Sequence, residues 1–504
     1  MNSAQDSRKP EFPAWPQFGE EERAGLVRAL EQGQWWRMGG GEVNAFEAEF
    51  GAYHGAAHAL AVTNGTHALE LALQVLGVGP GTEVVVPAFT FISSSQAAQR
   101  LGAVAVPVDI DPDTYNIDPA AAAAAITPRT AAIMPVHMAG QMCDMDALAK
   151  LSADSGVPLI QDAAHAHGAE WAGKKVGELG TVAAFSFQNG KLMTAGESGL
   201  VTLGTAEQYE QAFLRHSCGR PSTGRYYHHK TSGSNFRMNE FSASVLRAQL
   251  ARLGGQIDTR EANWQTLGEL LGAIDGVQPQ RIDARVTRNP HYMAMFRVPG
   301  LGAERRNVLV DALIERGLPA FAAFRAIYRS EGFWETGAPE ETVESIAARC
   351  PNTEAVYADA VWLHHRTLLG TTEQMRRIAD ILAQTLATLC TPRSGSPSRG
   401  SAGRAARSGS PASSRTPPTR SSPPWTPPAP PASPSRPAGP GFPSWTTSPT
   451  SRPSWSTSSS SPSPTTCTRR SPAGCWSAAS RSSWRSRCAS PPPRPTASRP
   501  PSAR

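Results

Sequence analysis

Residues 83–110 read EVVVPAFTFISSSQAAQRLGAVAVPVDI, and this stretch decides the fold. Residues 83–87 are a short continuous apolar run, which is typical of a strand covered on both faces. Residues 93–101 favour a helix, and residues 103–110 return to a second apolar run. A strand, a helix and another strand in this order indicate neighbouring strands of a mainly parallel sheet.

The same alternation continues along the chain. Apolar runs typical of strands recur at AAIMPVHMAG (131–140), VPLIQDAA (157–164) and VAAFSF (182–187), and residues 144–155 favour a helix between the first two. Upstream, residues 20–32 and 42–54 carry apolar side chains at helical spacing. The pattern predicts an α/β fold with helices on both faces of the sheet, whose ligands bind beyond the carboxyl ends of the strands.

The pattern changes near residue 256 to a long helix, a few strands and further helices. A globular chain of this length usually divides into two domains. We therefore predict a large domain over residues 1–255 and a smaller α/β domain over residues 256–389. Residues 390–504 form a separate tail.

The composition breaks after Leu389. The tail contains 16 Arg but no Asp, Glu or Lys, which leaves 32 basic against 42 acidic side chains for residues 1–389. The body is therefore acidic and the tail basic. The whole-chain charge of +6 averages two unrelated segments and gives no argument for a nucleic-acid partner.

The tail consists mainly of Ser, Pro, Arg, Ala, Thr and Gly, so it cannot bury a core and is expected to be disordered. One interpretation is an Arg/Ser-rich arm that binds nucleic acid or anionic lipid. The interpretation we favour is a frameshift near Leu389. Every tail residue except Phe442 has codons with C or G in the middle position, as expected when a GC-rich gene is read out of frame.

Several classes of protein are excluded. No segment reaches the roughly 18 uninterrupted apolar residues of a membrane span, and the first residues show no apolar signal region. Cys143, Cys218 and Cys350 lie far apart without CxxC spacing. We therefore expect a cytoplasmic protein with reduced thiols, no disulfide framework, no metal site and no membrane partner.

Three polar sites lie where strands end or helices begin. Asp162 follows the apolar run 157–161, and a carboxylate there is costly to bury without a cationic partner. Lys191 lies in a Gly-containing turn after the run 182–187, and Asn64-Gly65-Thr66 at a helix start offers N–H groups and a hydroxyl to a phosphate. Taken singly, each has an ordinary explanation: a helix cap, a solvated charge and a capped turn.

Together these residues fit one cofactor, pyridoxal 5'-phosphate. It needs an amine for a Schiff base, a carboxylate that keeps its ring nitrogen protonated, an anion site and an aromatic face. Four strand-end loops supply these roles: Lys191 the amine, Asp162 the carboxylate, Gly65, Thr66 and Ser186 the phosphate site, and Phe89 the aromatic face.

The motifs also carry a resemblance. NGTHALELAL (64–73), VVPAFTFISS (85–94), PVHMAGQM (135–142), QDAAHAHGA (161–169), FSFQNGKLMTAGE (185–197) and GSNFRMNEFSASV (233–245) occur in this order. They resemble the sugar-aminotransferase-like family of fold-type-I pyridoxal-phosphate enzymes across about residues 10–389. The resemblance implies an aspartate-aminotransferase-like fold.

The resemblance also implies roles. Lys191 would be the Schiff-base lysine, Asp162 the partner of the ring nitrogen and Phe89 the stacking residue. His165 would lie near the cofactor's phenolic oxygen. Gly65, Thr66 and Ser186 would hold the phosphate, and Asn235 would reach it from a second subunit, so that a homodimer shares its active sites.

Some implied roles stay open. Arg37 and Arg325 are candidate clamps for a substrate carboxylate, and we interpret His167 as a packing residue. Tyr226, Tyr227 and His228 either line the partner's substrate pocket or form a solvated loop. The chain also reads Gly-Glu-Ser-Gly at 196–199, where relatives carry Gly-Glu-Gly-Gly. If that position requires a positive φ, Ser198 would strain the turn by on the order of 1 kcal/mol.

A further set of motifs narrows the implied activity: EQGQWWRMGG (31–40), LRHSCGRP (214–221), GLPAFAAFRAIYR (317–329) and WLHHR (362–366). They resemble members that dehydrate and aromatise 5-amino-5-deoxy-3-dehydroshikimate, a small-molecule substrate, for the starter unit of ansamycin-type antibiotics. One alternative is an aminotransferase that moves an amino group from glutamine or glutamate to a keto-sugar or keto-inositol. Another is an inactive regulator whose basic tail binds DNA, against which the presence of Lys191 and Asp162 argues.

Overall fold

The computed structural model describes residues 9–223 and 227–390. At its centre, β1 (His58–Val62), β9 (Gly199–Leu203), β8 (Val182–Ser186) and β5 (Ile160–Asp162) pair in that order, and β3 (Val104–Val108), β2 (Glu83–Pro87) and β4 (Thr130–Ile133) pair in a second group. Isolated parallel bridges, Ile133–Leu159 and Val136–Asp162, join the two groups. Only β9 runs antiparallel to its neighbours, β1 and β8. The predicted mainly parallel sheet is confirmed.

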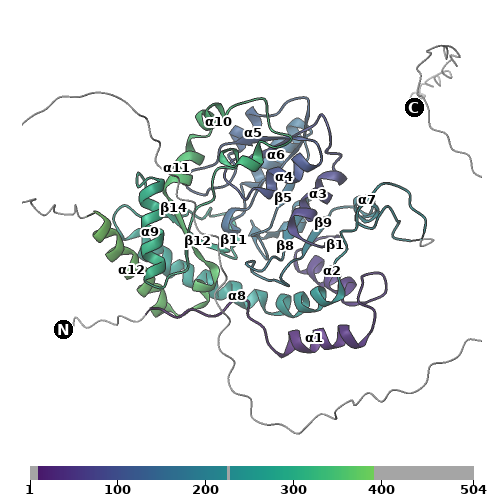
Figure 1. Ribbon diagram of the computed structural model, residues 1–504, viewed down its shortest axis with the longest axis horizontal. Helices are drawn as coiled ribbons and strands as arrows, with labels where there is room; N and C mark the ends of the chain where they lie inside the picture. Colours follow the sequence, from purple (N-terminus) through teal and green to yellow (C-terminus); the bar gives the residue numbers. More distant parts are fainter. Residues whose placement is uncertain (1–8, 224–226, 391–504) are drawn as a thin grey trace, which may run out of the picture. The chain divides into compact units, whose positions relative to one another are not determined.

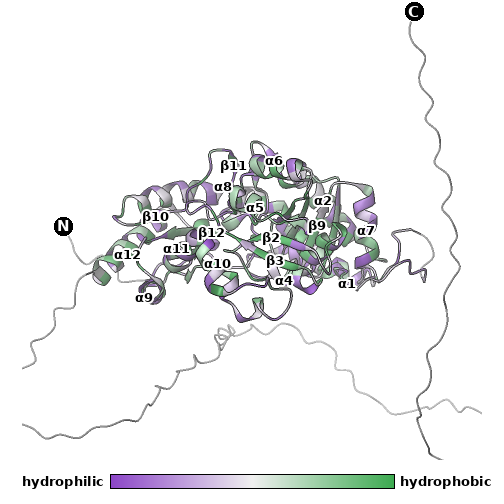
Figure 2. Ribbon diagram, turned by 90° about the horizontal axis from the view of Figure 1, so that it is seen from above, coloured by the Kyte–Doolittle hydropathy of each residue, from purple (hydrophilic) through white to green (hydrophobic). Residues whose placement is uncertain are grey.

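Helices cover both faces of this sheet because its strands are apolar on both sides. Val85 packs into one core, whereas its neighbours Val84 and Val86 pack into the other. The first core includes side chains of α2 (Glu42–Tyr53), α5 (Pro119–Ala124), α6 (Met145–Ser155) and α8 (Glu240–Gly272). The second includes side chains of α3 (Gly65–Val75), α4 (Ser93–Arg100) and α7 (Ala206–His216). Figure 1 shows this layered arrangement, and in Figure 2 strands such as β2 and β3 are mainly hydrophobic, whereas the helices carry both hydrophilic and hydrophobic residues.

A smaller antiparallel sheet has the strand order β10 (Gln278–Pro279), β12 (Met293–Arg297), β14 (Ala360–His364) and β13 (Ala320–Ala322). It shares a separate core with α9 (Ala303–Glu315), α12 (Thr372–Cys390) and the end of α8. The domain boundary predicted at residue 255 falls inside α8, which belongs to both cores, and this division stays a prediction. Apart from Cys390, which ends α12, the tail lies outside the described residues.

The remaining α-helices and strands are α1 (Glu20–Glu31), α10 (Val343–Arg349), α11 (Pro351–Asp359) and a small sheet of β11 (Val286–Arg288), β6 (Glu170–Trp171) and β7 (Lys174–Lys175). Most predicted helices agree with the structure to within a residue or two. Asp144, predicted as the first residue of a helix, caps α6 by accepting a hydrogen bond from the Ala147 N–H. Within the described residues, no helix is both long and apolar enough to cross a membrane.

Candidate active site

A cavity of about 600 Å³ lies where the loops after β2, β5 and β8 meet the start of α3 and the smaller sheet. Six of the predicted site residues line it: Gly65, Thr66, Asp162, His165, Ser186 and Lys191. Tyr292, Met293, Phe324 and Trp362 come from the C-terminal part of the chain and add an aromatic wall. Residues far apart in the sequence therefore meet at the carboxyl edge of the sheet, as expected for a fold of this type.

Lys191 lies in the tight turn that follows β8. Its backbone N–H donates to the Gln188 carbonyl at 2.8 Å, and its Nζ lies 4.6 Å from the centre of the Tyr292 ring. Burial lowers the pKa of the Lys191 amine from 10.5 to about 8, while nearby Asp162 opposes the shift. A lysine in this setting offers a neutral amine near physiological pH, which is the form that reacts with a carbonyl group.

Asp162 ends β5, is buried and lines the cavity. The Ser94 hydroxyl donates to its Oδ2 at 2.8 Å, and the Ala164 N–H donates to its Oδ1 at 3.2 Å. Burial raises the pKa of Asp162, whereas these hydrogen bonds and Lys191 lower it. A buried carboxylate with so few partners is suited to pair with a protonated ring nitrogen.

The first turn of α3 and the end of β8 form a narrow cradle. Asn64 caps α3 by accepting a hydrogen bond from the His67 N–H at 2.8 Å. A Cβ atom on Gly65 would lie 2.6 Å from the Ser186 Cβ, so only glycine fits there. The helix start, the Thr66 hydroxyl and the Ser186 hydroxyl all border the cavity, and this donor set suits a phosphate.

His165 faces the cavity beside Lys191. Its ring stacks on Tyr292 with the centroids 4.3 Å apart, and its buried Nδ1 has no hydrogen-bond partner among the described residues. Burial, reinforced by Lys191, holds the pKa of His165 well below its ordinary value. An unpartnered neutral imidazole nitrogen at a cavity wall fits the predicted contact with a bound cofactor. His167 does not line the cavity: its Nε2 bonds to the Ser186 carbonyl at 2.9 Å, and its Nδ1 also has no partner among the described residues.

The predicted stacking residue needs a correction. Phe89 is fully buried in the core and packs near Tyr115 and Phe324, and it is not among the residues that line the cavity. Phe91 lines the cavity and is 57% exposed. The apolar alternation of β2 continues inward to Phe89, whereas two residues later the chain has left the sheet. Phe91 therefore replaces Phe89 as the candidate for the ring contact.

Asn235 does not line the cavity of its own chain. It is exposed, and its Oδ1 accepts a hydrogen bond from the Arg237 N–H at 3.4 Å. Tyr227 is 83% exposed and His228 is also exposed, while Tyr226 lies outside the described residues. The predicted roles of these residues in a second subunit stay predictions.

Arg37 is not a carboxylate clamp within this chain. Its guanidinium forms a buried pair with Glu47 through two hydrogen bonds, at 3.0 and 2.5 Å, and also contacts the Tyr209 hydroxyl. A guanidinium committed to one carboxylate leaves little for another. Arg325 is exposed and follows Phe324, which lines the cavity, so it remains a candidate.

The strain predicted at Ser198 is absent. In the turn 196–199 the positive φ belongs to Gly196, at 86°, and Ser198 is buried with its hydroxyl bonded to the Glu197 carbonyl. The glycine that is sterically required in this turn is Gly199, because a Cβ there would lie 2.3 Å from the Asn64 carbonyl oxygen.

Sequence reasoning missed Ser94, Phe91 and Tyr292. Ser94 lies within Ser93-Ser94-Ser95 at the start of α4, and its position after a strand was a usable signal. No local pattern marked Tyr292. It immediately precedes β12 of the smaller sheet, far from Lys191 in the sequence, and only the folded chain brings the two together.

The chain belongs to the DegT/DnrJ/EryC1/StrS aminotransferase family, whose sequence profile matches residues 17–383. The fold is therefore that of the fold-type-I pyridoxal-phosphate enzymes, and the chain is an enzyme whose cofactor is pyridoxal 5'-phosphate. The unpartnered His165 nitrogen and the glycine cradle at Gly65 fit this group.

Individual relatives narrow the comparison. The chain is 72% identical, over 382 residues, to a protein named 3-amino-5-hydroxybenzoate synthase from Amycolatopsis mediterranei, and the alignment covers 75% of this chain and 98% of the relative. A crystal structure of 3-amino-5-hydroxybenzoic acid synthase superposes with a TM-score of 0.75 and 71% identity, over 76% of this chain and 100% of that one. An L-glutamine:2-deoxy-scyllo-inosose aminotransferase from Streptoalloteichus tenebrarius is 33% identical, over 77% of this chain and 97% of the relative.

Proposed function

We propose that the protein converts 5-amino-5-deoxy-3-dehydroshikimate into 3-amino-5-hydroxybenzoate with the loss of one water molecule. The observation that carries this proposal is the 72% identity over nearly the full length of the synthase from Amycolatopsis mediterranei. The cavity supports it, because Lys191 and Asp162 lie together with a phosphate cradle. The product would serve as the starter unit of an ansamycin-type antibiotic.

The residues of the cavity have separate tasks. When bound, pyridoxal phosphate supplies an electron sink that acidifies the C–H bond beside the substrate amine. Lys191, whose amine has a pKa of about 8, accepts that proton and can return it to the departing hydroxide. Asp162 holds a proton on the ring nitrogen through its buried carboxylate. Phe91 and His165 orient the ring, and Gly65, Thr66 and Ser186 bind the phosphate.

We also propose that the active unit is a cytoplasmic homodimer. Its support is an exposed apolar surface on α1 and the segment after it, formed by Leu26, Val27, Leu30, Trp35, Trp36 and Met38. An apolar surface of this kind is typical of a protein interface. Asn235, exposed and away from its own cavity, is available to a neighbouring subunit. Sedimentation should give a dimer, and a monomer at micromolar concentration would contradict the proposed dimer.

The proposed cytoplasmic location has separate support. The free thiols Cys143, Cys218 and Cys350 fit a reducing compartment.

The sequence boundary near Leu389 supports a further proposal. The family profile ends at residue 383, before the composition changes. We infer that the enzyme comprises residues 1–389 and that the tail arose by a frameshift. Resequencing the locus tests this directly, and an intact reading frame through Arg504 would contradict it.

The reaction is tested with the purified full-length protein loaded with pyridoxal phosphate. We expect an aromatic product that is lighter than the substrate by one water molecule, and no product with Lys191→Ala. A parallel incubation with glutamine alone tests the aminotransferase alternative, since transamination would convert the bound cofactor into its pyridoxamine form. That conversion without any dehydration of the aminodehydroshikimate would overturn the proposal.

A further inference from the structure

The turn that carries Lys191 is held from outside at two consecutive carbonyl groups. Trp15, in the segment before α1, donates from Nε1 to the Asn189 carbonyl at 3.2 Å. His365, in the 3-10 turn His365–Leu369 after β14, has its Nε2 3.1 Å from the Gly190 carbonyl. The backbone immediately before Lys191 is therefore fixed by parts of the chain far away in the sequence.

Arg260 contacts the other ring nitrogen of His365. It lies in α8, is fully buried, and places Nη2 3.3 Å from the Nδ1 of His365. A guanidinium can only donate hydrogen bonds, so Nδ1 must accept and the imidazole proton must lie on Nε2. In this tautomer Nε2–H donates to the Gly190 carbonyl. Burial, followed by the charge of Arg260, holds the pKa of His365 well below its ordinary value, which supports a neutral ring.

Arg260 is poorly compensated for a buried charge. Its Nε and Nη1 have no hydrogen-bond partner among the described residues, and no carboxylate there offsets the effect of burial on it. The Trp15 ring also lies near it, 5.7 Å from the guanidinium carbon. Arg306, also buried, donates instead to the Tyr357 and Ala360 carbonyls and to Asn307. An arginine kept for stability would have partners of this kind, because an unpaired buried charge is costly.

His365 also packs against Tyr292, the ring that contacts the Lys191 amine. The Tyr292 ring stacks with His365, at 5.7 Å between the centroids, and with His165, at 4.3 Å. The Lys191 amine lies against the Tyr292 ring. A change in the orientation of His365 would therefore reach both the backbone and the amine of Lys191.

We propose that Arg260 is a positioning residue for Lys191. It holds His365 in the tautomer that binds the Gly190 carbonyl, and this contact fixes the position of the Lys191 amine in the cavity. This proposal rests on one part of the proposed function, the binding of the cofactor by Lys191.

Arg260→Met tests the proposal in the full-length protein freed of cofactor. Methionine fills similar space without a charge, so the unfolding temperature should stay the same or rise. Binding of pyridoxal phosphate, followed by absorbance, should become about 10-fold to 100-fold slower because the amine is displaced. The matched control, Arg306→Met, should lower the unfolding temperature and leave the loading rate unchanged. An Arg260→Met protein that fails to fold, or loads at the wild-type rate, would overturn the proposal.

His365 variants test the contact itself. His365→Leu removes the donor to the Gly190 carbonyl and should slow loading as much as Arg260→Met. His365→Gln keeps an N–H at the position of Nε2 and should load normally, even when combined with Arg260→Met. Imidazole ¹⁵N shifts of the cofactor-free protein should place the His365 proton on Nε2 in the wild type and lose that preference in Arg260→Met. An unchanged tautomer, or a double variant as slow as Arg260→Met alone, would overturn the proposal.

These outcomes separate the two proposals. Normal cofactor loading by Lys191→Ala would refute the role of Lys191 and with it the proposed function. A strict requirement for Lys191, together with normal loading by Arg260→Met, would refute only the role of Arg260.

Discussion

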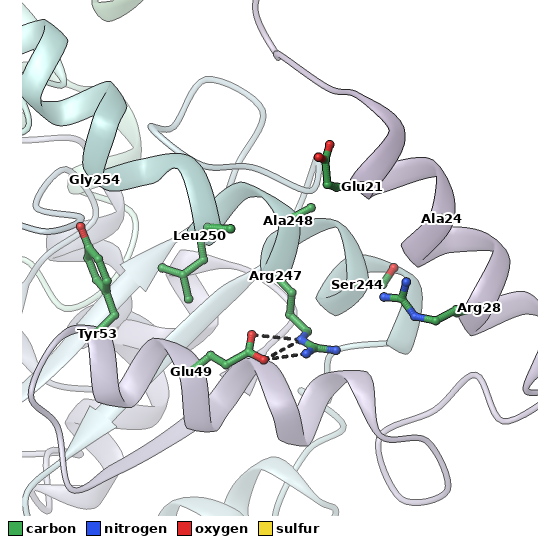
Figure 3. A pocket seen from close by; sticks show the side chains of 11 residues that line it. Glu21, Ala24, Arg28, Glu49, Tyr53, Ser244, Arg247, Ala248, Leu250 and Gly254 are labelled. Carbon is green, nitrogen blue, oxygen red and sulfur yellow. Dashed lines mark hydrogen bonds and ion pairs between the residues drawn. The ribbon is translucent and has the colours of Figure 1, made fainter.

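Two of the hollows in the part of the chain that the structure describes are similar in size and very different in chemistry. The groove between α1, α2 and α8 measures about 760 Å³, and the cavity around Lys191 about 600 Å³. Figure 3 shows the groove, where Arg247 points across to Glu49. Of these two, the larger hollow is the less reactive one. Size alone therefore does not identify the active site.

The difference lies in how the charges are partnered. In the groove, Arg247 binds Glu49 at 2.6 Å and Glu42 at 2.7 Å, and these hydrogen bonds raise the pKa of its guanidinium. In the cavity, burial moves both Lys191 and Asp162 toward their neutral forms. Groups that stay fully charged and paired are suited to structure, whereas groups near neutrality are suited to proton transfer.

The strongest test of this comparison is Lys191→Ala. Because the cavity would lose both its nucleophile and its base, turnover should fall by roughly 10⁴-fold or more. Substrate consumption by the cofactor-loaded protein measures this. A variant with even a tenth of the wild-type turnover would show that another group does the chemistry.

Asp162→Asn should have the next largest effect. The amide keeps the shape of the side chain but loses the charge that holds a proton on the ring nitrogen, so turnover should fall on the order of 10³-fold.

Ser94→Ala should have a smaller effect. It removes one hydrogen bond from Asp162, and turnover should fall about tenfold. Steady-state kinetics at saturating cofactor measure both, and the comparison fails if Ser94→Ala is the more damaging change.

The pH dependence of stability tests the Lys191 environment without any cofactor. Folding lowers the pKa of Lys191 from 10.5 to about 8, so between these values the unfolded chain binds more protons and stability rises with pH. Lys191→Met should therefore stabilise the cofactor-free protein below pH 8, by on the order of 1 kcal/mol, and less so toward pH 10.5. Urea unfolding of both proteins at pH 7 and pH 10 measures the difference. A gain that grows with pH would contradict the assigned shift.

Arg247→Met in the groove should have the smallest effect. Partly exposed ion pairs contribute little, so the free energy of unfolding should fall by no more than about 1 kcal/mol. Turnover and cofactor affinity should be unchanged. A large loss of activity with intact stability would mean that the groove is a functional site after all.

The sequence predicted what local patterns encode. The apolar runs predicted a mainly parallel sheet, and the polar residues that follow them singled out Lys191 and Asp162, which the structure brings to one cavity. Phe89 was wrong because the choice between it and Phe91 depends on where the chain leaves the sheet, which two similar residues do not reveal.

The sequence patterns could not predict contacts between residues that lie far apart in the chain. Arg37 looked available because its partner Glu47 binds it only in the folded chain. Tyr292, Arg260 and His365 all lie far from Lys191 in the sequence. His365 and Gly190 are 175 residues apart, and Arg260 and His365 are 105 residues apart. Such contacts depend on tertiary packing rather than on spacing.

The most direct test of the central claim is to identify the side chain that holds the cofactor. The full-length protein is loaded with pyridoxal phosphate, reduced with borohydride to make the attachment permanent, digested and analysed by mass spectrometry. We predict a single modified peptide, with the cofactor on Lys191. Modification of another lysine, such as Lys174 or Lys175, or of none, would contradict the account.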